Sequence, residues 1–243
     1  MLKFVAEEIS DPLSYVFNLS IDKGIFPSKL KVSRTVPIFK DGQRDDLGNY
    51  RPISCLPVLS KIIEKIVANE LHDYLESNDI LYKFQFGFQP GKSSIHPLLH
   101  ITNYIADAFN NDEVVVGIFL DFKKAFDLVD HSILLMKLEK IGIKGSLLNW
   151  FKSYLENRRQ FVMVNNTLST NELILNVSVP QGSILGPILF LIYINDFHNS
   201  NLLTNFHFAD DTSALTKGKN VQDLVPFVNN QIQKLGSGLG QTN

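Results

Sequence analysis

The sequence predicts a mixed fold of the α+β or α/β class. Apolar residues recur with helical spacing over residues 58–77, whereas residues 114–120 form a β-branched apolar run with the length of a strand. Hydrophobic residues make up 44% of the 243 residues and charged residues 20%, which is typical of a globular protein with a substantial core. Because the strand candidates are separated by helix candidates, an all-helical bundle is excluded.

The first half of the chain shows alternating helix, strand and loop signals. The helix near the N-terminus is expected to end at Gly24, since this glycine and Pro27 interrupt the helical pattern. The expected elements are, in order, a helix at residues 1–20, a strand at 32–40, a polar loop at 41–49, a helix at 58–77, an irregular Gly/Pro loop at 84–94 and a helix at 95–110.

The second half begins with the apolar run at 114–120, whose near-continuous hydrophobicity predicts a strand covered on both faces. Residues 236–243 show no helix or strand period. Between these segments the expected elements are helices at 123–139 and 146–156, strands at 160–165 and 172–179 around a turn at Asn165-Asn166, an apolar helix at 184–197, a hairpin around 208–211 and a helix at 221–235.

Bulk properties narrow the class of protein. No uncharged apolar run reaches the roughly 18 residues of a membrane span, and the acidic N-terminus does not match a signal peptide. With Cys55 as the only cysteine, an intrachain disulfide is excluded and a reducing compartment, nucleus or cytoplasm, is expected. The net charge of −2 counts mildly against nucleic-acid binding, although local basic clusters matter more than the sum.

Asp210 and Asp211 form the most informative acidic pair. They follow a short aromatic run, and neighbouring strand residues point to opposite faces, so both carboxylates are hard to bury as ordinary core. The tip of a hairpin that holds a metal ion is one interpretation. A surface turn in which Asp binds its own backbone is the other.

Asp121 is the second informative carboxylate, since it ends the apolar strand candidate. It is interpreted as the N-cap of a helix over 122–139, as a cation ligand, or as both, because an uncompensated charge is costly beside a core. If the fold brings Asp121 close to Asp210, the carboxylates suit Mg²⁺, with Mn²⁺ as a second option. Two such ions could clamp an in-line phosphoryl displacement.

Several further segments occur in a specific order along the chain. They are residues 34–40 (RTVPIFK), 49–56 (NYRPISCL), 84–92 (FQFGFQPGK), 117–131 (GIFLDFKKAFDLVDH), 179–187 (VPQGSILGP), 193–197 (YINDF) and 207–211 (HFADD). Taken together, they resemble the reverse-transcriptase domain of a non-long-terminal-repeat retrotransposon of the LINE or jockey-like kind. The resemblance runs across nearly the whole chain.

The resemblance implies an α+β right-hand polymerase fold, with an antiparallel palm sheet and helices. Residues 1–20 would be a helical extension and residues 21–243 the reverse-transcriptase domain. The fingers would comprise about 21–98 and 128–180, and the palm about 99–127 and 181–243. The chain is expected to be truncated at its C-terminal end, without the thumb that grips the duplex.

The resemblance also assigns roles to residues. Asp121, Asp210 and Asp211 would be the catalytic metal ligands, and Phe126 the aromatic gate that excludes a 2′-hydroxyl. The remaining assigned residues are Lys40 and Arg51 on the triphosphate, Gln181 and Gly182 at the nucleotide, and Phe208 and Ala209 as packing residues at the catalytic hairpin. Phe208 replaces the family's usual tyrosine and keeps the ring. Asp127, Asp130 and His131 are interpreted as helix-surface or packing residues.

The expected function is an RNA-directed DNA polymerase that joins nucleotides to a primer 3′-hydroxyl by a two-metal mechanism. The expected partners are an RNA template, a DNA primer and deoxynucleoside triphosphates, with no membrane. The alternative is a non-catalytic, truncated remnant with at most RNA binding. The sequence leaves the oligomeric state open.

Overall fold

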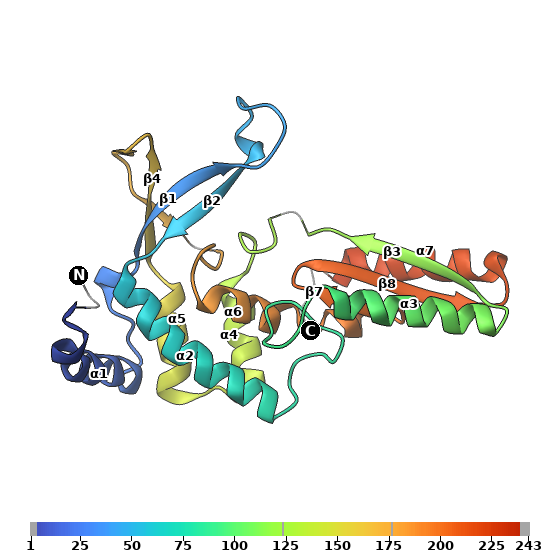
Figure 1. The fold of residues 1–243 in the computed structure, drawn as a ribbon, viewed down its shortest axis with the longest axis horizontal. Helices are drawn as coiled ribbons and strands as arrows, with labels where there is room; N and C mark the ends of the chain where they lie inside the picture. Colours follow the sequence, from blue (N-terminus) through green and yellow to red (C-terminus); the bar gives the residue numbers. More distant parts are fainter. Residues whose placement is uncertain (1–3, 123, 176, 239–243) are drawn as a thin grey trace. The chain divides into compact units, whose positions relative to one another are not determined.

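The computed structural model describes residues 4–122, 124–175 and 177–238 (Figure 1). The chain divides into two compact units. The first comprises Met1–Asp73 and Phe126–Leu189, and the second Tyr74–Ala125 and Phe190–Asn243. Helices and antiparallel strands occur in both units, which confirms the predicted α+β class.

Helices make up the core of the first unit. They are α1 (Ala6–Asp22), the larger part of α2 (Val58–Ser77), α4 (His131–Lys140) and α5 (Gly145–Leu155). Phe26 packs edge-on against Trp150 and Tyr154 of α5, at ring-centroid distances of 5.3 and 5.1 Å. The Trp150 indole donates to the Ser20 hydroxyl over 3.0 Å, so a buried polar contact ties α1 to α5, and ring packing ties the segment after α1 to the same helix.

The sheet of the first unit has the strand order β2-β1-β4-β5, and β6 also pairs with β4. Its strands are β1 (Val32–Phe39), β2 (Tyr50–Cys55), β4 (Arg158–Val164), β5 (Thr167–Leu168) and β6 (Leu173–Leu175). β1 pairs antiparallel with β2 and parallel with β4. Asn165 and Asn166 have φ values of 47° and 64°, as a two-residue hairpin turn requires, and they connect β4 to β5.

The second unit is built on an antiparallel sheet with the order β3-β8-β7, against which α3 and α7 pack (Figure 1). Its elements are α3 (Ile95–Asn110), β3 (Val114–Leu120), β7 (Thr204–Phe208), β8 (Asp211–Gly218) and α7 (Val221–Gly238), and α6 (Leu185–Ile194) is divided between the two units. Phe86, Phe206 and Leu215 form a buried apolar cluster beside α3. Short 3₁₀ turns complete the chain at Ser28–Leu30, Leu47–Asn49 and Phe197–Ser200.

Three elements differ from the sequence prediction. The strand at 114–120 was expected to be covered on both faces, but β3 is an edge strand and Phe119 is 77% exposed. The helix expected at 123–139 begins only at His131, because Asp130 accepts from the backbone N–H groups of Ser132 and Ile133 and caps it there. The strand expected at 172–179 is reduced to Leu173–Leu175. Positions 1–3, 123, 176 and 239–243 of the predicted segments lie outside the described residues.

In the part of the chain that the structure describes, no helix combines the length and apolarity needed to cross a membrane. The division into fingers and palm stays a prediction.

Candidate active site

The hairpin between β7 and β8 presents the acidic pair. Phe208 pairs with Asp211, so Ala209 and Asp210 form a two-residue turn. Ala209 has a φ of 59°, the left-handed conformation that such turns use. Phe208 packs against the apolar cluster of the second unit and Ala209 is buried, whereas Asp210 is half-buried and Asp211 exposed. The turn therefore keeps Ala209 inside and leaves Asp211 exposed to solvent.

Strand pairing brings Asp121 to the same end of the sheet. β3 pairs antiparallel with β8, and the last pair of this ladder is Leu120 with Thr212. An acid adjoins this pair on each of the two segments, Asp121 after Leu120 and Asp211 before Thr212. The three predicted ligands thus belong to one unit and to adjoining strand ends, although Asp121 is distant in sequence. The interpretation of Asp121 as a helix N-cap is wrong, since Asp130 has that role.

The donor set at this end of the sheet fits a magnesium or manganese ion in its chemistry. Hard cations prefer carboxylate oxygens, and Mg²⁺ usually takes only one or two protein carboxylates and completes its shell with water and substrate phosphates. Among residues 4–122, 124–175 and 177–238, no group of three Asp, Glu, His or Cys side chains is close enough to hold a metal ion. The carboxylates are therefore aligned by the backbone but are not gathered into a closed cage.

A buried histidine lies directly behind the hairpin. His207 is 3% exposed, and its Nδ1 lies 2.7 Å from the Thr212 hydroxyl on the facing strand. Burial lowers the pKa of His207 to about 4, and the neighbouring His198 contributes in the same direction. At neutral pH the ring is therefore uncharged and adds no positive charge beneath the carboxylates.

The first unit brings together several of the residues assigned to the nucleotide. The Val179 N–H donates to the Phe126 carbonyl over 3.1 Å, and the Gln181 side-chain amide donates to the Asp127 carboxylate over 2.9 Å. The Ser178 N–H donates to the Val129 carbonyl over 2.9 Å. Residues 126–129 therefore lie alongside residues 178–181, so Phe126 and Gln181 are neighbours despite their separation in sequence.

Strand β2 holds the turn that contains Gln181 and Gly182. The Ser54 N–H donates to the Gln181 carbonyl over 2.8 Å. Gly182 has a φ of 104°, and a Cβ there would lie 2.7 Å from the Ser54 carbonyl oxygen. Only glycine fits both this backbone conformation and this close approach.

Arg51 and Lys40 belong to the β1–β2 ribbon. Arg51 pairs with Ile38, and the Lys40 N–H donates to the Asn49 carbonyl over 2.8 Å. Both cationic side chains are exposed. The ribbon therefore presents two positive charges near its turn, which is a suitable arrangement for polyphosphate.

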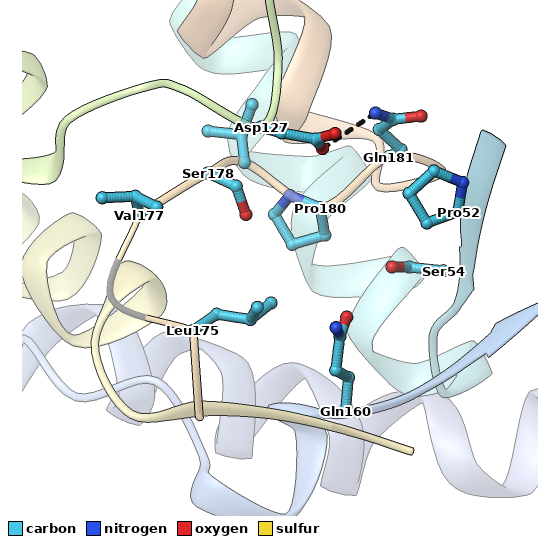
Figure 2. Close-up of a pocket in the computed structure, with 10 residues that line it drawn as sticks. Pro52, Ser54, Asp127, Gln160, Leu175, Val177, Ser178, Pro180 and Gln181 are labelled. Carbon is cyan, nitrogen blue, oxygen red and sulfur yellow. Dashed lines mark hydrogen bonds between the residues drawn. The ribbon is translucent and has the colours of Figure 1, made fainter. Parts of the chain in front are cut away.

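A cavity of about 210 Å³ lies beside the Gln181 turn (Figure 2). Side chains from β2, β4 and the 175–181 segment line it, together with Asp127. The lining residues are Pro52, Ser54, Asp127, Gln160, Leu175, Val177, Ser178, Val179, Pro180 and Gln181. Gln160 accepts a hydrogen bond from the Thr35 hydroxyl over 3.0 Å, which fixes its amide on the floor of this cavity.

Glu64 fixes the segment that follows this turn. It is fully buried on α2 and accepts from the Ile184 and Leu185 N–H groups over 2.9 and 3.4 Å, at the start of α6. The Ser60 hydroxyl donates to the same carboxylate over 2.7 Å. Burial and the Glu64 charge raise the pKa of Tyr154, which therefore stays protonated beside it. A buried charge is thus stabilised by donors and by the positive end of a helix dipole.

The structure adds two candidate residues, Asp127 and Gln85, that the sequence did not assign to the site. Asp127 was interpreted as a helix-surface or packing residue, but no helix includes it and its carboxylate binds the Gln181 side chain. Gln85, within the 84–92 motif, is 3% exposed and contacts the acidic hairpin. A glutamine between two phenylalanines was the available signal for this buried contact. His131, in contrast, does pack as interpreted, with its Nε2 2.8 Å from the Ser178 carbonyl oxygen.

Comparison with protein families gives one match to most of the chain. The family model described as "Reverse transcriptase (RNA-dependent DNA polymerase)" matches residues 38–240 of this chain. Among curated proteins of Drosophila melanogaster, the probable RNA-directed DNA polymerase from transposon BS is 35% identical over 204 residues, covering 84% of this chain and 22% of that protein. The RNA-directed DNA polymerase from mobile element jockey is 34% identical over 229 residues, covering 90% and 25%. The chain thus spans about a quarter of these relatives or slightly less.

Solved structures of telomerases have a similar fold. Apo telomerase from Candida tropicalis, truncated from the C-terminal domain, has a TM-score of 0.61 and 14% identity, covering 93% of this chain and 51% of that one. Telomerase from Candida albicans, in complex with a fragment of telomeric RNA, has a TM-score of 0.62 and 12% identity, covering 88% and 41%. At these identities the similarity shows the fold alone.

Proposed function

Because this chain belongs to the reverse transcriptase (RNA-dependent DNA polymerase) family, we propose that it carries the nucleotidyl-transfer site of a retrotransposon polymerase of the non-long-terminal-repeat kind. Its substrates would be an RNA template, a DNA primer and deoxynucleoside triphosphates. In this proposal residues 21–98 and 128–180 act as fingers, and residues 99–127 and 181–243 as palm. The observation that carries the proposal is the β3–β8 register, whose last pair is Leu120 with Thr212. Asp121 follows this pair on one segment, and Asp211 precedes it on the other, next to Asp210 in the turn.

Asp121, Asp210 and Asp211 would hold the divalent ions, Mg²⁺ or Mn²⁺. When bound, such ions supply Lewis-acid activation of the primer 3′-hydroxyl and neutralise charge on the triphosphate. In the transfer, the primer 3′-oxygen forms a bond to the α-phosphorus, its proton passes to solvent, and pyrophosphate leaves with the electrons of the broken P–O bond. The carboxylates themselves would orient the reacting groups from the ends of paired strands and the turn between them.

The first unit would bind the incoming nucleotide. Arg51 offers a planar fork to phosphate and Lys40 a mobile point charge. Gly182 permits close approach of the backbone, and the Gln181 carboxamide is held in place by Asp127. The Phe126 ring would exclude a 2′-hydroxyl and so select deoxynucleotides.

Primer extension on an RNA template tests this function. The purified chain is given deoxynucleotides with Mg²⁺ or Mn²⁺, beside an Asp210→Asn variant and a matched Asp223→Asn variant whose carboxylate lies on α7. The expected result is incorporation by the unaltered chain and by Asp223→Asn, and loss of at least about 1,000-fold in Asp210→Asn.

A folded chain that incorporates no nucleotide under either metal would overturn the polymerase proposal. RNA binding that persists without incorporation would instead favour the non-catalytic alternative. Equal incorporation by Asp210→Asn and Asp223→Asn would refute the site assignment.

A further inference from the structure

We propose that Gln85 is a positioning residue for the acidic hairpin. Its carboxamide contacts both backbone polar groups of Ala209 and so sets the directions of the Asp210 and Asp211 side chains. The inference rests on the proposed role of those carboxylates. It assigns a task to the 84–92 segment, which the proposed function leaves without one.

The segment around Gln85 lies beside strand β7 and is joined to it by one isolated parallel bridge. The His207 N–H donates to the Phe84 carbonyl over 2.9 Å, and the Phe86 N–H donates to the His207 carbonyl over 2.8 Å. Gln85 therefore lies opposite His207 in this bridge. From this position its side chain extends along β7 to the turn.

The Gln85 carboxamide binds the first residue of that turn. Its Oε1 accepts from the Ala209 N–H over 3.1 Å and from the Gly87 N–H over 2.8 Å. Its Nε2 reaches the Ala209 carbonyl oxygen at 3.4 Å, a longer and weaker contact. Because Gln85 is 3% exposed, water competes little for these groups.

Ala209 has a specific need for such a partner. Its φ of 59° lies in the left-handed region, which residues with a Cβ seldom adopt. Its buried N–H would otherwise lack an acceptor, and burying an unpaired amide is unfavourable. Gln85 therefore favours the conformation from which the chain continues into Asp210. Rotation at Ala209 would redirect both following carboxylates.

The loop is also held firmly against the turn. A Cβ at Gly87 would lie 2.1 Å from the Ala209 nitrogen, so the two backbones are in direct contact. On the other side, the Gln85 carbonyl accepts from the Gln89 side chain over 2.7 Å and from Lys92 Nζ over 3.2 Å. These two bonds hold the loop backbone, whereas the carboxamide of Gln85 is held separately by Ala209 and Gly87.

Substitution of Gln85 separates this role from simple loop stability. Gln85→Leu removes all three carboxamide contacts with a side chain of similar size, and Gln85→Asn keeps the amide but is one methylene too short to reach Ala209. Gln89→Leu is the matched control, since it weakens the same loop without touching Ala209. Each variant is checked for cooperative thermal unfolding.

The expected result for both Gln85 variants is a fall in kcat of about 10–100-fold in primer extension, with a higher Mg²⁺ concentration at half-maximal rate. The KM for template–primer stays constant. Direct Mn²⁺ binding, followed by electron paramagnetic resonance, weakens by a similar factor. Exchange of the Ala209 amide hydrogen, measured by NMR, accelerates at least about tenfold. Gln89→Leu leaves all of these values within about twofold.

Folded Gln85 variants with the kcat of the unaltered chain overturn the inference, as does unchanged exchange of the Ala209 amide. If the unaltered chain incorporates no nucleotide, Mn²⁺ binding decides. In that case, weaker Mn²⁺ binding by the Gln85 variants supports the positioning role. The missing incorporation then counts against the polymerase proposal alone. Equal Mn²⁺ binding in all variants refutes the positioning role itself.

Discussion

The Gln181 side chain donates a hydrogen bond from Nε2 to Oδ1 of Asp127 over 2.9 Å (Figure 2). A carboxylate accepts only, so this contact fixes which end of the Gln181 amide faces Asp127. The carbonyl oxygen of that amide is consequently turned away and is free to meet another group. Asp127 thereby determines that the 180–182 turn presents the Gln181 carbonyl oxygen, and not its NH₂ group, on the side away from Asp127.

Asp127→Ala would release the Gln181 amide. We expect the KM for deoxynucleotide to rise about tenfold, equivalent to about 1.4 kcal/mol, because a charge-assisted hydrogen bond that orients the binding group is lost. Steady-state single-nucleotide insertion measures this effect. Asp22→Ala, which removes an exposed carboxylate at the end of α1, is the control. An unchanged KM in Asp127→Ala would contradict a nucleotide-positioning role for the pair.

Phe126→Ala would test the proposed sugar gate. Removing the ring makes room for a 2′-hydroxyl, so the preference for deoxynucleotides over ribonucleotides should fall about 10–100-fold. The ratio of kcat/KM for the two nucleotide classes measures the preference. Insertion of deoxynucleotide by the same variant controls for general loss of activity. Equal selectivity in the variant would show that another residue discriminates the sugar.

Glu64→Ala would remove the buried acceptor at the start of α6. Three donors lose their partner, so the free energy of unfolding should fall by about 2–3 kcal/mol. Chemical denaturation measures the change. Glu70→Ala on the exposed face of the same helix should shift stability by less than about 0.5 kcal/mol. Similar effects from both substitutions would argue that α2 propensity, and not capping, is being measured.

Gly87→Ala would force the 84–92 loop away from the acidic hairpin. The added Cβ meets the Ala209 backbone, which cannot rotate aside, and we expect a loss of about 2–3 kcal/mol in stability. Gly117→Ala on β3 is the matched control, because its Cβ would meet only side-chain atoms, at 3.7 Å or more. Thermal unfolding of the two variants compares them. A stable Gly87→Ala protein would show that the loop is not pressed against the turn in solution.

His207 predicts a pH dependence of stability. Burial lowers its folded-state pKa to about 4, below the unfolded value of 6.5, so the unfolded chain takes up the proton first as the pH falls. The stabilisation is fully present above pH 6.5 and is lost as the pH falls through about 4, by about 3 kcal/mol in all. Urea denaturation between pH 7 and pH 4 measures the slope.

Two variants separate the causes of this slope. His207→Leu removes the titrating group and should flatten the profile in this window. Thr212→Val breaks the contact to Nδ1 but keeps the ring buried, and should retain most of the slope because burial is the larger cause. A flat profile in the unaltered chain would mean that His207 is hydrated in solution.

Strong local periodicity was sufficient to predict some elements from the sequence. The helix expected at 58–77 is found at Val58–Ser77, since a long apolar stripe is little affected by its surroundings. The helix expected from position 123 instead begins at His131. Local propensity could not reveal that Lys124 adopts a φ of 57° or that the Asp130 side chain caps the helix later.

The pairing of strands and the contacts between distant segments could not be predicted from the pattern of residues alone. The apolar run of β3 predicts a strand covered on both faces, but no residue of β3 is fully buried, since hydrophobicity alone does not determine what packs on each face. The Leu120–Thr212 register and the neighbouring positions of Phe126 and Gln181 depend on contacts between segments far apart in sequence. Only the order of the motifs pointed to these groupings. The Gln85 contact to Ala209 was not anticipated, because a single buried amide has no sequence period.

The position of β3 at the edge of its sheet has a consequence for how the acidic site loses its order. In the described part of the chain, β8 is the only strand that pairs with β3, whereas β7 is paired on both sides, by β8 and by the Gln85 segment. Opening β3 therefore breaks one ladder and leaves the β7–β8 hairpin intact. We expect β3 to belong to a less stable cooperative unit, whose fluctuations detach Asp121 from a hairpin that remains folded. On warming, Asp121 would leave its position beside the hairpin at a temperature well below that at which the whole chain unfolds.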